Sequence, residues 1–168
     1  MNDLIVDVKL WGESVGSLYW EKESNAALFD YERKFIRSGL DISPIIMPID
    51  QYRNTPYRFL ENRTDCFKGL PGLFADSLPD TFGNQIINEW FASKGLSREE
   101  ITPLDRLCYV GKRGMGALEF EPSSPINGMN ESSVLHIEEL TELAQFVFTD
   151  RMAFQTQLRR KEETYWIY

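Results

Sequence analysis

An alternation of apolar residues at the start of the chain constrains its fold more than any other feature. Residues 4–10 carry Leu4, Val6, Val8 and Leu10 at every second position, which is the period of a β-strand with one buried face. Residues 15–21 and 26–31 are also rich in strand-forming residues, and polar breaks separate the three runs. Three short strands with short connections predict an antiparallel β-meander.

Glycine and proline mark the segments that follow. Residues 32–38 stop at Gly39, which predicts a short helix with a glycine just past its end. Residues 42–47 are apolar, but Pro44 and Pro48 cannot donate hydrogen bonds to a strand ladder. A strand in this segment is therefore expected only at the edge of a sheet.

The character of the sequence changes after a polar stretch. Residues 1–50 are predicted to form a small antiparallel β subdomain with a short helix, and residues 51–65 a connecting segment. A mainly helical subdomain with one further strand is expected over 66–150, and a tail over 151–168. The expected fold class is α+β.

Helical spacing and capping residues define the elements of the second part. An apolar stripe predicts a helix over residues 82–91 that is capped by Asp80 or Thr81. Ser97 and Glu100 have the spacing of a capping box. The other expected elements are a short helix ending before Pro79, a helix opening at Thr102 and Pro103, a strand over 117–121 and a helix over 137–149.

Charge and composition exclude several classes of protein. Eighteen basic residues against 26 acidic ones give a net charge of −8, so direct binding to nucleic acid is disfavoured. No apolar run approaches the roughly 20 residues of a membrane-spanning helix, so no membrane partner is expected. Two cysteines make no disulfide framework, and no secretory signal is evident, so a cytoplasmic location is expected.

The chain offers few residues for catalysis or metal binding. Its single histidine, His136, and two distant cysteines, Cys66 and Cys108, cannot supply a zinc site. His136 is expected to make local hydrogen bonds rather than to act as a base. The carboxylate pair Asp76 and Asp80 could serve acid–base chemistry, but helix capping explains Asp80 more simply. No catalytic and no metal-binding residue is predicted.

Two further clusters have a structural and a functional interpretation. Residues 111–116 are dense in glycine around Lys112 and Arg113, but they lack the residue order of a P-loop or a dinucleotide site. A tight turn that needs positive φ is favoured over a phosphate-binding loop. Core packing is favoured over a base-stacking platform for the aromatic residues Trp11, Tyr19, Trp20, Phe29 and Tyr31.

Two segments resemble the N-terminal region of HipA-like toxin kinases. Residues 67–80 contain a small-residue, Leu-Pro-Asp turn, and residues 102–122 contain a Val-Gly-x-x-Gly-Met-Gly-Ala-Leu loop, in the order and spacing of that family. Residues 8–18 and 29–31 are also similar to its first subdomain. The positions that match the family motifs, and that are expected to be structural or partner-facing, are Gly69, Pro71, Asp76, Leu78, Pro79, Asp80, Gly111, Gly114 and Gly116.

The resemblance implies the non-catalytic front half of a serine/threonine kinase that is the toxin of a type II toxin–antitoxin system. It implies two partners, a C-terminal kinase domain, either in cis or as a separate chain, and a DNA-binding antitoxin protein. In the family, the nucleotide-binding loop and the catalytic and metal-binding aspartates follow the helix predicted here over 137–149. ATP and Mg are therefore expected only with the kinase domain.

The sequence leaves two hypotheses for function. The first is a binding module that packs on the kinase core and contributes to antitoxin binding, which predicts an exposed apolar patch. The alternative is a self-contained nucleotide-binding protein or enzyme that uses residues 111–116. It lacks a recognisable base, metal site and nucleophile, so the binding module is favoured.

Overall fold

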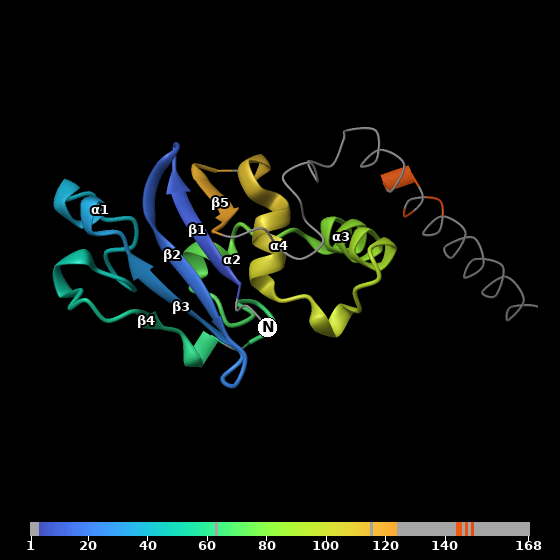
Figure 1. Ribbon diagram of the computed structural model, residues 1–168, viewed down its shortest axis with the longest axis horizontal. Helices are drawn as coiled ribbons and strands as arrows, with labels where there is room; N and C mark the ends of the chain where they lie inside the picture. Colours follow the sequence, from blue (N-terminus) through green and yellow to red (C-terminus); the bar gives the residue numbers. More distant parts are fainter. Residues whose placement is uncertain are drawn as a thin grey trace, which may run out of the picture. The chain divides into compact units, whose positions relative to one another are not determined.

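The computed structural model of the chain describes residues 4–62, 64–114 and 116–123, together with Ala144, Gln145, Val147 and Thr149. In these ranges, five strands form one antiparallel sheet with the order β4-β3-β2-β1-β5 (Figure 1). This confirms the expected α+β class, the meander and the further strand. The strands are β1 (Ile5–Leu10), β2 (Glu13–Glu21), β3 (Ala26–Tyr31), β4 (Tyr57–Arg58) and β5 (Leu118–Pro122).

Capping residues set the ends of the helices. Asp80 accepts a hydrogen bond from the Gly83 N–H at 2.7 Å, and Thr102 and Asp105 form a reciprocal capping box. A capping box is thus present at Thr102, and the one expected from Ser97 and Glu100 stays a prediction. The α-helices are α1 (Arg33–Ser38), α2 (Gly72–Ala75), α3 (Thr81–Ser93) and α4 (Pro103–Val110), and the 3-10 turns are η1 (Ile49–Gln51), η2 (Leu60–Asn62), η3 (Arg98–Glu100) and η4 (Gly111–Arg113).

Residues 42–47, where a strand was expected only at the edge of a sheet, form turns. The Asp41 carboxylate accepts hydrogen bonds from the N–H groups of Ser43 and Ile49 and holds the segment as turns. Met47 is fully buried in the core and its carbonyl accepts a bond from the Tyr31 hydroxyl at 2.8 Å. The edge position belongs instead to the two residues of β4.

Contacts group the chain into two compact units. The first comprises Met1–Pro79 with Glu99–Asn130, and the second Asp80–Arg98 with Glu131–Tyr168. The sheet, α1, α2 and α4 belong to the first unit, and α3 to the second. The division of the chain by a connecting segment at 51–65 stays a prediction.

The core of the first unit lies on one face of the sheet. Phe74 of α2 is fully buried, with its ring centroid 5.0 Å from that of Phe29 in β3 and 6.2 Å from that of Phe120 in β5. Leu104 and Leu107 of α4 are also fully buried in this cluster. The two segments that resemble the kinase family therefore meet inside one core, through Phe74 and Phe120.

The predicted helix over 137–149 is only partly described. Ala144, Gln145, Val147 and Thr149 are helical, and the Thr149 hydroxyl donates to the Gln145 carbonyl at 2.8 Å. The remainder of that helix, His136 and the tail lie outside the described residues.

Candidate protein-interaction site

Gly69 lies against the hairpin between β2 and β3. Its carbonyl accepts a hydrogen bond from the Ala27 N–H at 2.8 Å, and its φ is +80°. A Cβ atom here would stand 2.6 Å from the Asn25 carbonyl oxygen and 3.0 Å from the Trp20 ring. Glycine is therefore required at this position both by backbone conformation and by space.

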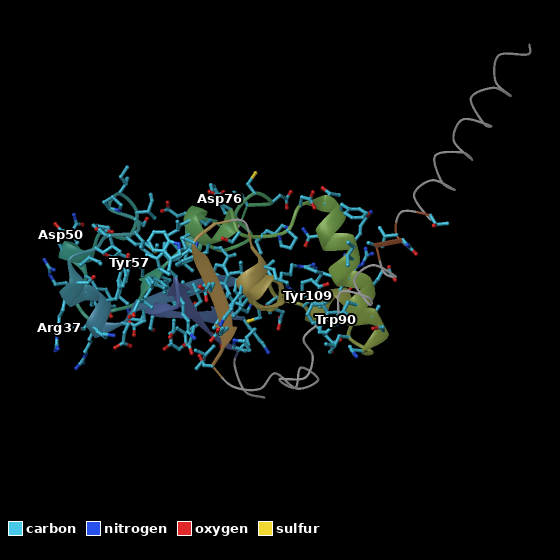
Figure 2. The ribbon with its side chains drawn as sticks, turned by 90° about the horizontal axis from the view of Figure 1, so that it is seen from above. Arg37, Asp50, Tyr57, Asp76, Trp90 and Tyr109 are labelled. Carbon is cyan, nitrogen blue, oxygen red and sulfur yellow. The ribbon has the colours of Figure 1, made fainter. Side chains whose placement is uncertain are left out.

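The other motif residues after Gly69 surround α2 and lead to α3. Pro71 is buried and precedes the first residue of α2, while Leu78 is half-buried against the core. Asp76 is exposed just after α2 (Figure 2). Pro79 is half-buried, and Asp80 caps α3. The only one of these side chains that faces solvent without a capping role is Asp76.

The glycine-dense segment connects α4 to β5. Gly111 has a φ of +55° and its N–H donates to the Leu107 carbonyl, and Gly116 has a φ of +133°. Gly114 has an ordinary φ, but a Cβ atom there would lie 3.0 Å from Cγ1 of Val110. Two of the three glycines thus have the positive φ that a tight turn needs.

Both cations of this segment interact with neighbouring residues. The Lys112 ammonium lies 2.9 Å from a carboxylate oxygen of Glu121 and 4.0 Å from one of Glu119. The Arg113 guanidinium lies over the ring of Tyr109, 5.5 Å from its centroid, and donates to the Tyr109 carbonyl. A phosphate bound here would have to compete with the Glu121 and Glu119 carboxylates.

The turn between β1 and β2 displays the most unusual exposed residue. Trp11 and Gly12 form a two-residue connection in which both φ angles are positive, +51° and +82°. The left-handed conformation is uncommon for a bulky side chain and costs about 1–2 kcal/mol. Trp11 is nevertheless 78% exposed.

Trp11 lies at the mouth of an apolar groove of about 350 Å³ between the turn and α1. At the rim, the Lys34 ammonium lies 3.3 Å from the Glu13 carboxylate, and both side chains are largely exposed. We call this surface the Trp11 groove; its lining residues are Leu10, Trp11, Glu13, Ser14, Lys34, Phe35, Ser38 and Leu40.

Core packing was confirmed for three of the five aromatic residues and was wrong for Trp11, while Tyr19 is half-buried outside the core cluster. Trp20, Phe29 and Tyr31 are buried in the core. Trp11 is exposed because it occupies the turn itself rather than a strand position. The Trp-Gly pair between two alternating runs was the available signal.

The match to known proteins covers both motifs. The family model of the HipA N-terminal domain matches residues 6–121. The chain belongs to this family. The matched region runs from β1 to β5, so it contains the whole sheet, the Trp11 groove and both glycine segments. No curated protein matches the chain.

Among the residues that the structure describes in this HipA N-terminal domain, no group of three or more metal-ligating side chains is present. Cys108 is half-buried, and burial raises the pKa of its thiol far above the usual range, so it is not a ready nucleophile. No described helix has the length and apolar character to cross a membrane.

The Glu121 carboxylate forms ion pairs with Lys9 and Lys112 on the sheet face opposite the core. Hydrogen bonds from the ammonium groups of Lys9 and, next, Lys112 lower the pKa of its carboxyl group. A lowered pKa in the folded protein stabilises the fold above the ordinary pKa of the carboxyl group. That contribution is lost as the pH falls through the folded-state value.

We expect Glu121→Gln to reduce the free energy of unfolding by about 0.5–1 kcal/mol at neutral pH, since partial exposure screens the ion pairs. The difference from wild type should shrink at a pH below the lowered folded-state pKa, where the carboxyl group is protonated in both states. Urea unfolding at both pH values measures this. Glu13→Gln, which breaks an exposed pair, is the control with almost no expected effect. A difference that stays constant with pH would contradict this account.

Proposed function

We propose that the chain is the non-catalytic N-terminal module of a HipA-like serine/threonine kinase toxin. It packs on the C-terminal kinase domain, either in cis or as a separate chain, and contributes to binding of a DNA-binding antitoxin. Membership of the HipA N-terminal domain family supports this partner set. A cytoplasmic location suits these partners.

The Trp11 groove is the observation that carries the proposal. Leu10, Phe35, Leu40 and Trp11 line it, and Trp11 and Leu40 are 78% and 50% exposed. A left-handed tryptophan in water costs conformational energy without any gain from burial, and outliers of this kind are concentrated at functional sites. Tryptophan is also the side chain most enriched among residues that dominate protein interfaces. We therefore assign the Trp11 groove to contact with the kinase domain.

Trp11→Asn tests this assignment, because asparagine tolerates the left-handed backbone that the turn requires. We expect about thirtyfold weaker binding to the kinase domain, as for an interface residue worth about 2 kcal/mol. Titration calorimetry of the purified chain against the kinase domain gives the affinity. Ile45→Ser is the control, since Ile45 is more exposed than Trp11 but does not line this groove. Equal losses for both variants would contradict the assignment.

The chain alone is proposed to bind no nucleotide. The cations of the glycine segment interact with Glu121, Glu119 and Tyr109, and the positive φ angles of Gly111 and Gly116 fit a connection between α4 and β5. Calorimetric titration with ATP and Mg²⁺ should give no saturable heat. Saturable binding that is lost in Gly114→Val would instead support the nucleotide-binding alternative.

A further inference from the structure

The outer edge of β4 carries a second apolar surface. A groove of about 530 Å³ runs beside this strand, which is the last strand of the sheet at that end. Ile46, Leu60 and Phe67 line it and are 58%, 38% and 39% exposed. We call it the β4 groove; its other lining residues are Tyr57, Arg58, Phe59, Glu61, Asn62 and Gly72.

The ladder between β2, β3 and β4 fixes where the backbone of β4 points. The Glu32 N–H donates to the Val15 carbonyl, so the even-numbered residues of β3 direct their backbone groups toward β2. The odd-numbered residues therefore point the other way, as the bond from the Ala27 N–H to the Gly69 carbonyl confirms.

This alternation leaves one hydrogen-bonding unit on the outer edge. Phe29 is opposite Tyr57, so these two residues exchange the hydrogen bonds between β3 and β4. Arg58 is opposite Leu28, so its N–H and C=O point away from β3 at the edge of the sheet, and Arg58 also lines the β4 groove. In the part of the chain that the structure describes, no strand lies beyond β4. One donor and one acceptor at strand spacing are what an incoming extended chain would pair with.

Tyrosine hydroxyls hold this edge in place. The Tyr57 hydroxyl donates to the Pro48 carbonyl at 2.7 Å, and Tyr31 donates to the carbonyl of the adjacent Met47 (Figure 2 labels Tyr57). These bonds fix the segment that carries Ile46 relative to β4. A surface ordered in advance loses less entropy when it binds.

Sheet proteins often use short edge strands and charged side chains to prevent another chain from pairing with the edge, and β4 has both features. Edges that are protected in this way are normally flanked by polar residues. Here the neighbouring side chains Ile46, Leu60 and Phe67 are apolar and exposed, so they do not protect the edge from pairing with another chain. The combination of an open backbone unit with exposed apolar side chains in the same groove favours recognition.

We propose that the β4 groove binds an extended segment of another protein, which adds to the sheet at Arg58 and places alternate apolar side chains against Ile46, Leu60 and Phe67. Only a polypeptide in extended conformation satisfies the Arg58 N–H and C=O together and also presents side chains at the two-residue period. The occupant is thus a strand with apolar residues at every second position. This surface does not include the Trp11 groove and does not depend on the kinase domain.

The test is selection of a phage-displayed library of random twelve-residue peptides on the purified full chain. We expect enriched peptides with apolar residues at alternate positions, and about tenfold or greater loss of their affinity in Arg58→Pro. Proline removes the outward N–H but not a ladder bond, and proline is tolerated at edge strands. Arg58→Ala loses the same side chain and its contact with Glu21 but keeps the N–H, so it should bind within about threefold of wild type.

Ile46→Ser and Ile45→Ser form the side-chain comparison. Both residues are largely exposed, but Ile46 lines the β4 groove and Ile45 lines neither groove. Ile46→Ser should weaken peptide binding about tenfold and Ile45→Ser should leave it unchanged. The Arg58 N–H should also exchange with solvent more slowly when peptide is bound.

Three results would overturn the proposal: no enriched peptide, equal affinity of Arg58→Pro and Arg58→Ala, or a wild-type chain that is dimeric in sedimentation and becomes monomeric in Ile46→Ser. The last result would assign the groove to a second copy of the chain. The kinase domain is absent from all these measurements, so their outcome is independent of the proposed function.

Discussion

Phe74→Ala is expected to reduce the free energy of unfolding by about 3–5 kcal/mol, the cost of removing a fully buried aromatic ring. Phe74 is the residue through which the two family motifs meet, since its ring touches those of Phe29 and Phe120. Its loss leaves a cavity between α2 and the sheet that the rigid strands cannot close. Urea unfolding followed by circular dichroism measures the change.

Phe67→Ala is the matched control for this experiment. Phe67 is more than one third exposed and lies outside the core cluster, so its truncation should cost less than half as much. Similar losses for the two variants would show that Phe74 does not have the central position assigned to it.

Gly69→Ala is expected to cost about 2–5 kcal/mol, because it combines two separate penalties. The left-handed backbone at φ +80° disfavours any Cβ atom, and that atom would also stand 2.6 Å from the Asn25 carbonyl oxygen. The hairpin of β2 and β3 must move away to relieve the contact. That movement would break the bond from the Ala27 N–H to the Gly69 carbonyl.

Gly39→Ala separates the two penalties of the previous substitution. Gly39 has a similar φ of +73° but no atom within 4 Å of its Cβ position, so only the backbone penalty of about 1–2 kcal/mol applies. The same urea titration compares both variants. If Gly69→Ala costs no more than Gly39→Ala, the close approach to the hairpin is not a determinant of stability.

The local pattern of the sequence predicted where the helices and strands lie better than which strands pair in the sheet. The two-residue period identified β1, β2 and β3, and the cap residues Asp80 and Thr102 marked the starts of α3 and α4. The strand near residues 117–121 was also predicted. Its pairing with β1 was not, because Val8 and Phe120 are opposite each other across more than a hundred residues and no local signal encodes that register.

Periodicity failed where side-chain hydrogen bonds control the backbone. Residues 42–47 have the apolar content of a strand, but the Asp41 carboxylate and the Tyr31 hydroxyl hold them as turns. Apolar content also cannot distinguish the buried Met47 from the exposed Ile46 next to it. Exposure depends on the final packing, so the sequence did not locate the β4 groove.

Among the site residues too, features set by local sequence were predictable and features set by long-range contacts were not. The positive φ of Gly111 and Gly116 follows from the residue type and the turn. The steric requirement at Gly69 depends on its approach to a hairpin more than 40 residues earlier in the chain, which the sequence does not contain. Core packing was favoured for Trp11 because the net charge of −8 and the few cations between the aromatic residues disfavour a base-stacking platform, whereas its place in the turn exposes it.

The central claim is that this HipA N-terminal domain is a docking module for a kinase domain. The most direct measurement is purification of the tagged chain after co-expression with the polypeptides encoded beside it, followed by light scattering of the eluted complex. The account predicts an equimolar complex with a polypeptide that carries a glycine-rich nucleotide loop and catalytic aspartates. The account is contradicted if that polypeptide is produced in folded form and the chain elutes without it.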